Sequence, residues 1–400
     1  MSDGWAVLMA AVAAAGALVA APIPLPAAVL LGLAAYLLRK PVLLCAAVGL
    51  AASSLSARAH DGLTVPEGRV TLEGRATLLT DPAAALHSAV KVELRLDGRH
   101  IEAFAHGAGA AALRPMLAGQ TISVAGTAKA VTGKRRAYLA SRHIALQLSI
   151  AKATDPRPGG PVARATNAVR TILVRGTAAM AKDQQAMFAG FVLGDGRDEP
   201  PATVDDFRQS GLTHLLVVSG ENVAFVLALA AVPLRFLGLR GRLIGGLAVL
   251  VFFGALTRWE PSVLRAEAMA GVALLATYLG RPASTVRLLA LAVAGLILVD
   301  PLLIRSVGFG LSVGACTGIA LLAGPLTRRL RLPLPLASRP ANLLAVPAAG
   351  PLTMWGMAAG IPAGLAGGRW AAALHAPTVM LMAWIERVAH WAARLSWPNL

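Results

Sequence analysis

Long apolar runs occupy most of the chain, and the first three open the sequence at about 5–20, 23–38 and 41–55. A membrane-spanning helix needs about 20 apolar residues, with about 17 as the lower limit, so each run is somewhat short. A signal peptide would need a positively charged start, and the residues before Trp5 include Asp3 and no Lys or Arg. We therefore predict three short spans within residues 1–58.

Apolar runs return after residue 210 and continue almost to the end of the chain. The pattern predicts seven further spans, at about 212–238, 243–257, 262–280, 288–304, 307–326, 341–359 and 371–393. Together with the first three, they predict a polytopic α-helical membrane protein of about ten spans, with residues 211–400 as its main membrane domain.

The stretch from 61 to 152 has a different period. Residues 91–96 alternate polar and apolar side chains, which is typical of a strand with one buried face. Asp97-Gly98 follows as a favoured type I′ hairpin turn. Further strands are expected at 69–78, 101–105, 120–128 and 136–145. Such a set fits a small all-β, OB-like barrel inserted outside the membrane, although a small sandwich has the same pattern.

Two connecting segments follow this β domain. Residues 155–161 are rich in Pro and Gly and predict a linker. Residues 164–193 show apolar positions at helical spacing, interleaved with charges. We expect an amphipathic helix there, at the membrane surface or against other helices. The region 160–210 is thus predicted as an amphipathic helix and connector.

Composition and charge support this organisation. Charged residues make up 14% of the chain, against about 25% in soluble proteins, and the mean hydropathy is +0.65. The net charge is +17. With a cytoplasmic N-terminus, the inner connections carry ten Lys and Arg, while the short outer ones carry three Arg. This asymmetry predicts cytoplasmic termini and an extracytoplasmic β domain, and explains much of the charge without nucleic acid.

A polar group interrupts the first apolar run of the second half, at Ser219-Gly220-Glu221-Asn222. A charged side chain at bilayer depth costs at least about 2.5–3.5 kcal/mol, so it normally faces water or a protein interior. Gly220 permits a helix break whose freed backbone groups line a cavity. The alternative is that Glu221 lies near the membrane interface and is merely solvated.

The same region carries a family resemblance. Gly194-Asp195, then Phe207-Arg-x-Ser-Gly211-Leu-x-His214-Leu-x-x-Val-Ser-Gly-x-Asn222-Val, resembles the signature of the ComEC family of DNA-uptake proteins. Later motifs of that family are matched, in order, by Pro261-Ser-x-x-Arg265, Asp300-Pro301 and Gly308-Phe309-x-Leu-Ser312. The resemblance is strong over 190–320 and weak before 160. Many members have His where Asn222 stands, so a role of that imidazole does not transfer.

The resemblance implies passage of single-stranded DNA across the bacterial inner membrane during natural transformation. Its expected path is formed by Ser219, Gly220, Glu221, Asn222, Arg265 and His214. Ser219 and Asn222 would supply donors, and Arg265 a cation at the mouth. An ion pair of Arg265 with Glu221, Glu260 or Glu267 is the alternative. The expected partners are single-stranded DNA, membrane lipid, an external DNA receptor, a cytoplasmic ATPase, a separate nuclease and a second copy of the chain.

Chemistry beyond transport finds little support in the sequence. There is no P-loop, and no His-x-His-x-Asp cluster of the nuclease domain found in long family members. We therefore expect no nuclease activity, no cofactor and no metal, in a short member or a fragment. Two other functions stay open: a secondary transporter of a smaller anion, and a membrane-embedded hydrolase using His214, Glu221 or Asp195.

The β domain offers a possible DNA contact. Lys134, Arg135 and Arg136 stand beside Tyr138, and Phe104 is expected on a neighbouring strand. Non-specific single-strand binders combine basic grooves with stacking aromatic side chains. A solvated hairpin tip is the alternative.

Overall fold

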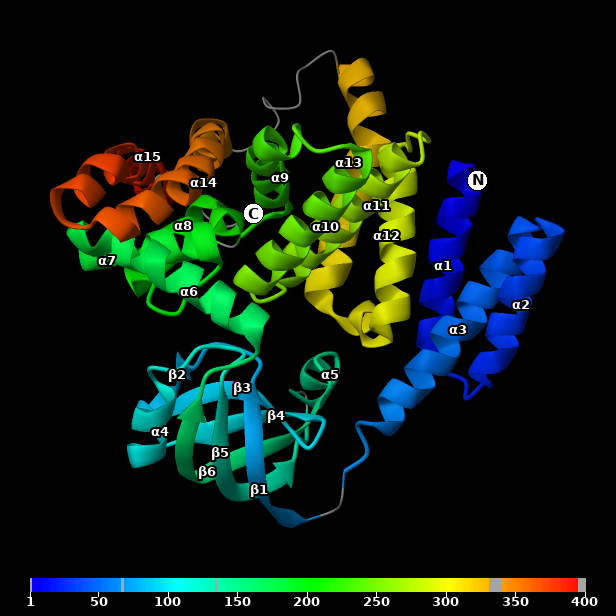
Figure 1. Cartoon of the computed structure of the whole chain (residues 1–400), viewed down its shortest axis with the longest axis horizontal. Coiled ribbons are helices and arrows are strands. Elements are labelled where there is room, and N and C mark those ends of the chain that lie inside the picture. Colours follow the sequence, from blue (N-terminus) through cyan, green and yellow to red (C-terminus); the bar gives the residue numbers. More distant parts are fainter. Residues whose placement is uncertain (1, 66–67, 134, 217, 331–339, 395–400) are drawn as a thin grey trace. The chain divides into compact units, whose positions relative to one another are not determined.

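The computed structural model describes residues 2–65, 68–133, 135–216, 218–330 and 340–394, with the backbone alone described over 323–330. The chain divides into two compact units. Figure 1 labels their helices and strands. The first contains Met1–Arg164 and Ala268–Ala320, and the second contains Ala165–Glu267 and Leu321–Leu400.

The first unit begins with three helices, α1 (Asp3–Val19), α2 (Leu25–Leu38) and α3 (Pro41–Asp61). Small residues allow α1 and α3 to pack closely, since a Cβ on Gly16 would overlap the carbonyl oxygen of Gly49. Small-residue contacts of this kind are typical of helices in membranes. The same unit contains α12 (Thr285–Val299), the short 3₁₀ helix η5 (Pro301–Arg305) and the start of α13 (Val307–Leu330).

A small β-barrel follows α3 in the first unit. Its strands are β1 (Arg69–Leu78), β2 (Ala83–Ala84), β3 (Val90–Leu96), β4 (Arg99–Ala105), β5 (Thr121–Ala130) and β6 (Ile144–Arg157). The sheet order is β1-β5-β6-β4-β3-β2, and an additional β1–β3 pairing closes it. The β4–β6 pair is parallel, and the others are antiparallel. Helix α4 (Gly107–Leu113) lies between β4 and β5 in the chain.

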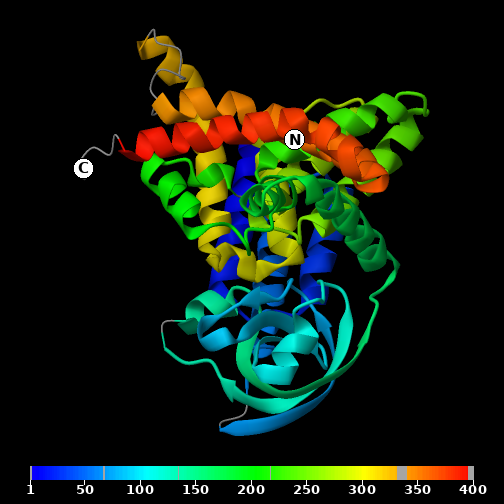
Figure 2. The same cartoon turned by 90° about the vertical axis from the view of Figure 1, so that its left-hand side faces the viewer.

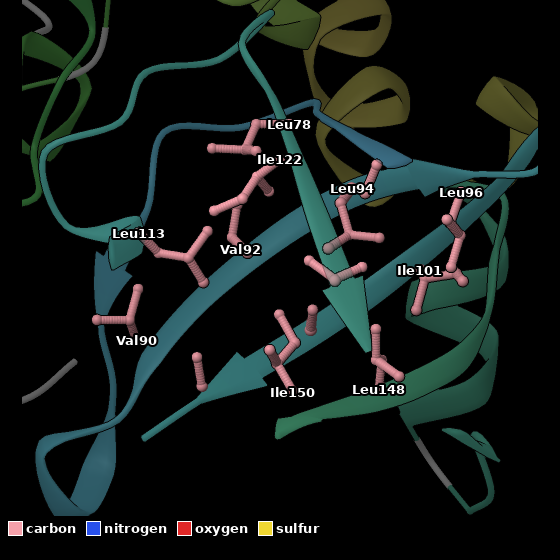
Figure 3. Packing of buried hydrophobic residues seen from close by; sticks show 14 of the residues in the cluster. Leu78, Val90, Val92, Leu94, Leu96, Ile101, Leu113, Ile122, Leu148 and Ile150 are labelled. Atoms are coloured by element: carbon pink, nitrogen blue, oxygen red, sulfur yellow. The ribbon is translucent and has the colours of Figure 1, made fainter. Parts of the chain in front are cut away.

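The barrel core comes from the apolar half of the strand alternation. Figure 3 shows side chains from several strands and from α4 directed to one interior, and every member of this cluster is at most 5% exposed. The labelled members are Leu78, Val90, Val92, Leu94, Leu96, Ile101, Leu113, Ile122, Leu148 and Ile150. The predicted hairpin is confirmed, because Asp97 and Gly98 join β3 to β4 with φ of +50° and +77°.

Two local predictions for this region are wrong. Residues 136–145 do not form one strand: α5 (Arg135–Ala140) occupies the first half of this stretch, and β6 begins only at Ile144. Burial of Leu139 and the pairing of Arg135 with Glu102 hold this segment as a helical turn. The linker expected at 155–161 begins too early. β6 continues to Arg157, and a register shift opposite Thr121 and Ser123 accommodates Pro156.

The second unit is helical throughout its described residues. The predicted amphipathic helix at 164–193 is divided into four pieces: α6 (Pro161–Gly176), the 3₁₀ turn η2 (Thr177–Ala179), α7 (Lys182–Phe188) and the π-helical turn η3 (Ala189–Leu193). The extended backbone of Met180, with ψ of 160°, ends the second piece. α6 begins at the boundary, with Pro161–Arg164 counted in the first unit.

The remaining helices are α8 (Pro201–Ser210), η4 (Thr213–Leu215), α9 (Gly220–Leu234), α10 (Leu239–Leu256), α11 (Pro261–Tyr278), α14 (Pro340–Ala366) and α15 (Gly368–Arg394). α11 ends, and α13 begins, in the first unit. Within the described residues, four stretches are long and apolar enough to cross a membrane: α3, Thr213–Leu234, α10 and α14. Shorter apolar helices are α1, α2, α12 and Val307–Leu322.

These candidates do not include α11 or α15, which occupy the spans predicted at 262–280 and 371–393. Each carries charged side chains inside the predicted span, such as Arg265 and Glu267 in α11. The count of about ten spans therefore stays a prediction.

Candidate functional site

The apolar run of the second unit is interrupted where the sequence predicted. α9 begins at Gly220, with Ser219 as its N-cap, and the Ser219 hydroxyl oxygen accepts a hydrogen bond from the Glu221 backbone N–H at 3.2 Å. A Cβ on Gly220 would lie 2.9 Å from the Ala266 Cβ and 3.2 Å from an Arg265 guanidinium nitrogen. The absence of a side chain at Gly220 therefore lets α11 approach the start of α9.

A pocket of about 100 Å³ lies beside this break. A water molecule needs about 10–15 Å³ by this measure, so the pocket has room for several. Four predicted path residues line it: His214, Ser219, Glu221 and Asn222. The remaining lining residues are Phe191 and Leu215, with Val346, Ala349, Gly350 and Thr353 from α14.

Two side-chain hydrogen bonds hold the break in place. The Asn222 amide is buried, and its Nδ2 donates to the Phe191 carbonyl oxygen at 3.4 Å. The Ser262 hydroxyl of α11 donates to the Val218 carbonyl oxygen at 2.9 Å. The Asn222 amide thus has a structural partner, although the residue also lines the pocket.

Arg265 does not lie where the sequence analysis expected it. Its side chain is 9% exposed and packs behind the break, beside Gly220. Neither Arg265 nor Gly220 is among the described residues that line the pocket. The buried position of Arg265 differs from that of a cation at an open mouth, so a role of Arg265 in the DNA path stays a prediction. The ion-pair alternative remains open.

A buried charge network lies next to the predicted motif residue Asp195. Arg170 of α6 is 4% exposed and donates to the Asp195 carboxylate at 2.9 Å. Arg170 also donates to the carbonyl oxygens of Leu256 at 2.7 Å and Leu193 at 3.2 Å. It therefore joins α6, η3 and the end of α10 around one guanidinium. The sequence alone does not distinguish Arg170, because its only signal is a cation within an amphipathic segment.

Arg197 completes this network from the other side, with Nε donating to Asp195 Oδ1 at 2.6 Å. Burial raises the pKa of Asp195, but the hydrogen bonds and charge of Arg197, together with the charge of Arg170, outweigh it. The pKa of Asp195 therefore lies below its usual range. Because this carboxylate is bound in structural ion pairs with two arginines, its surroundings do not favour a catalytic role.

Glu199 lies near Asp195 in the same loop. Burial, and then the charge of Asp195, raise the pKa of Glu199 to about 6. Its Oε1 atom is buried and has no hydrogen-bond partner among the described residues. A Cβ on Gly190 would overlap this carboxylate, so Gly190 provides the space it occupies.

Three other motif residues, Gly194, Gly211 and Asp300, have identifiable structural roles. Gly194 and Gly211 end η3 and α8 with φ of +69° and +76°, a backbone conformation that favours glycine. Asp300, Pro301, Phe309 and Ser312 belong to the first unit. There Asp300 caps η5, with Oδ1 accepting from the Leu302 N–H at 3.0 Å, and Oδ1 also lies 2.8 Å from His143 Nε2 of the barrel.

The basic cluster of the β domain is only partly available for DNA. Lys134 lies outside the described residues. Arg135 donates to both oxygens of the fully buried Glu102 carboxylate, at 2.7 and 2.9 Å. Arg136 and Tyr138 are exposed on α5. Phe104 is half-buried on β4, as predicted for a strand residue.

Within the described ranges, no three His, Cys, Asp or Glu residues lie together in an arrangement that could hold a metal ion.

Comparison with known proteins places these residues in a family. Residues 191–335 match the family described as Competence protein, which covers the break, its pocket-lining residues before α14, and the Asp195 network except Arg170. The chain carries a competence domain.

The family match confirms the resemblance found in the motifs. Together with the apolar helices, it indicates a membrane protein. An uncharacterized protein of Escherichia coli K12, YcaI, is 27% identical over 143 residues, which is 34% of this chain and 19% of YcaI. The chain therefore matches about a fifth of that protein's length. No solved structure matches the chain significantly.

Proposed function

We propose that this protein is an inner-membrane conduit that passes a single DNA strand during natural transformation. The observation that carries the proposal is the interrupted helix at Ser219-Gly220, with a pocket beside it that could hold water. A polyanion cannot enter hydrocarbon, so it needs a hydrated path past polar groups. The path would follow Ser219, Glu221, Asn222 and His214, with Arg265 behind them.

The pocket as it stands is too small for a nucleotide strand, so the described conformation corresponds to a closed state. Its far wall is α14, and a Cβ on Gly350 would lie 2.8 Å from the Phe225 ring of α9. This close packing indicates how the path would widen. Separation of α14 from α9 would enlarge the pocket without altering the Asn222 hydrogen bond that holds the other side of the break.

We further propose that the barrel is an OB-type domain outside the membrane that captures the strand. Five strands form a closed ring in the order β1-β3-β4-β6-β5, and α4 connects β4 to β5. OB barrels bind single strands by stacking bases on aromatic side chains beside cations. Arg136 and Tyr138 on α5 are the candidates, because Arg135 is already paired with Glu102.

Transport needs energy from a partner, because the sequence contains no P-loop. An external DNA receptor, a cytoplasmic ATPase and a separate nuclease are the partners that the proposal requires. A second copy of the chain could complete the conduit. Cytoplasmic termini and an outer barrel remain the proposed topology.

A secondary transporter of a smaller anion is the second candidate, because a pocket of about 100 Å³ suits a small solute better than a strand. The hydrolase alternative has no comparable support. Asp195, one of its three candidate residues, is bound by two arginines.

The test is a blocked pocket in a transformable host that lacks its own copy of the protein. Ala349→Trp places an indole in the pocket wall of α14, and Ala358→Trp places the same group on an exposed position of that helix. We expect DNA uptake to fall to the level of the deletion strain with the first variant and to stay normal with the second. Equal membrane levels of both variants must be verified by immunoblot. Normal uptake with Ala349→Trp would exclude this pocket from the DNA path.

A further inference from the structure

The last two helices of the second unit form an antiparallel hairpin. The Trp384 indole N–H of α15 donates to the Leu344 carbonyl oxygen of α14 at 2.9 Å. Nearer the turn, the Trp355 indole N–H of α14 donates to the Leu374 carbonyl oxygen at 2.8 Å. Because the two helices are joined at both places, they must share one orientation relative to a membrane.

α15 has two apolar faces. The face that packs inside the unit follows helical spacing and includes Ala371, His375, Thr378, Met382, Ile385 and Ala389. The opposite face is an exposed stripe made of Trp370, Met380, Trp384 and Trp391, whose side chains are 43–74% exposed. A soluble surface rarely presents three tryptophans along one helix face.

Cations follow the exposed stripe. Arg387 stands three residues after Trp384, and Arg394 stands three residues after Trp391, so each shares a helix face with its tryptophan. Both arginines are exposed. Tryptophan is enriched at membrane–water interfaces, and arginine binds phosphate groups through its planar fork. The stripe therefore has the chemistry of a surface for phospholipid headgroups.

The direction of the hairpin supports the same interpretation. Within the second unit, α9 runs vertically in Figure 1, whereas α14 and α15, orange to red, run across the vertical in Figure 2. The hairpin therefore runs across the direction of α9. If α9 crosses the membrane, as its apolar composition predicts, the hairpin lies close to the membrane plane.

The positions of Trp and Arg along α15 do not suit a membrane-spanning helix. Trp370 and Trp391 are 21 residues apart, about 31 Å along a helix, which matches the hydrocarbon thickness of about 30 Å. Trp384 and Arg387 would then lie inside the hydrocarbon, facing lipid. An exposed Arg there is unfavourable. α15 is also not among the described helices that are apolar enough to cross.

We propose that the α14–α15 hairpin lies in the plane of the membrane and that the exposed stripe of α15 binds the interfacial layer of a bilayer with anionic lipids. This replaces the span predicted at 371–393. It also removes α14 from the crossing helices despite its apolar composition, because α15 and α14 share one direction. The proposal does not depend on the DNA path.

Depth measurement on the whole protein in liposomes provides the test. Cys45 and Cys316 are replaced by Ala, and single cysteines replace Ala373, Met380 or Trp391 for spin labelling. Collision with oxygen and with a water-soluble nickel chelate then gives the depth of each label. Ile244→Cys and Val251→Cys on exposed positions of α10 serve as references, since seven residues of a crossing helix should differ by about 10 Å in depth.

We expect all three α15 labels at one shallow depth, about 5–10 Å below the headgroups. Labels at 373 and 391 on opposite sides, with 380 near the centre, would show a spanning helix and overturn the proposal. Labels that collide only with the nickel chelate would place the stripe in water. Labels that neither reagent reaches would place it against protein, and either result would also overturn it.

The anionic component is tested with a charge-matched pair of double variants. Arg387→Gln with Arg394→Gln removes two charges from the stripe, and Arg75→Gln with Arg157→Gln removes two from the barrel. The preference of the protein for spin-labelled phosphatidylglycerol over phosphatidylcholine is measured for each. We expect about a tenfold loss of preference for the first pair only. Equal preference in both would show that the stripe does not select anionic lipid.

Discussion

The barrel and the second unit near the helix break both contain buried charges, but the partners of these charges differ. In the barrel, Glu102 is fully buried and is neutralised by Lys91 and Arg135 from adjoining parts of the same domain. In the second unit, the buried Arg170 guanidinium donates hydrogen bonds to the Asp195 carboxylate and to carbonyl oxygens of η3 and α10. The first network stabilises one domain. The second joins α6 and α10 to η3, which contributes Phe191 to the pocket wall, so its loss should affect transport as well as stability.

The largest expected effect is at Asp195. Asp195→Asn keeps the shape but removes the negative partner of a buried guanidinium, which should destabilise the protein by about 3–5 kcal/mol. Thermal unfolding in detergent measures the loss. Asp205→Asn is the matched control, because Asp205 pairs with Arg208 on the surface and should cost less than about 1 kcal/mol. Equal losses would contradict the assignment of Asp195 to a buried network.

Glu102→Gln should cost less, about 2 kcal/mol. Its two cationic partners are 35–53% exposed and can regain water when the carboxylate is lost. The freed Arg135 should then be available to DNA. We expect the variant to unfold at a lower temperature but to bind single-stranded DNA more tightly at low salt. Unchanged stability would show that the carboxylate is not required in the barrel.

Tyr138→Ala tests whether the barrel binds single-stranded DNA. Stacking of a base on an aromatic ring contributes about 1–3 kcal/mol, so affinity of the whole protein for single-stranded DNA should fall about tenfold. Arg136→Ala should weaken binding and reduce its salt dependence. Tyr36→Ala is the control, because Tyr36 is exposed on α2, outside the barrel. The same loss in the control would mean that the barrel face has no specific role.

The smallest expected effect concerns the pH dependence at the break. Burial raises the pKa of Glu199 in the folded state from its ordinary 4.5 to about 6. The folded state then binds more protons between these values, so stability should fall as pH rises from about 4.5 to 6. Glu199→Gln should raise the free energy of unfolding by about 1 kcal/mol at pH 7, since partial exposure weakens the effect of burial. At pH 4 it should change the free energy of unfolding very little. Thermal unfolding at both pH values checks this, and an equal gain at both would contradict it.

The sequence predicted the barrel well because its signals are local. Alternation at 91–96 and the turn at Asp97-Gly98 depend on neighbouring residues, and both are confirmed. The errors arose where distant contacts decide. The segment 136–145 contains β-compatible residues, but Glu102, more than 30 positions away, draws Arg135 into a helical turn. Pairing with β5 likewise extends β6 through Pro156.

The site was only partly predictable for the same reason. Ser219, Gly220, Glu221 and Asn222 were recognisable, because polar residues within an apolar run are unusual. The location of Arg265 behind Gly220 depends on the approach of α11, and the pocket wall from α14 lies more than 100 residues away. Arg170 resembles any cation of an amphipathic helix until its buried partners are known. Neither spacing nor composition contains that information.

The central claim is that transported DNA passes the helix break. A photo-crosslinking amino acid at Ser219 should capture incoming DNA during uptake, while the same group at Val232, on an exposed part of α9, should not. Crosslinks at position 219 alone, in a strain that still takes up DNA, are the predicted result. Active uptake with no crosslink at 219, or with equal crosslinking at both positions, would contradict the account.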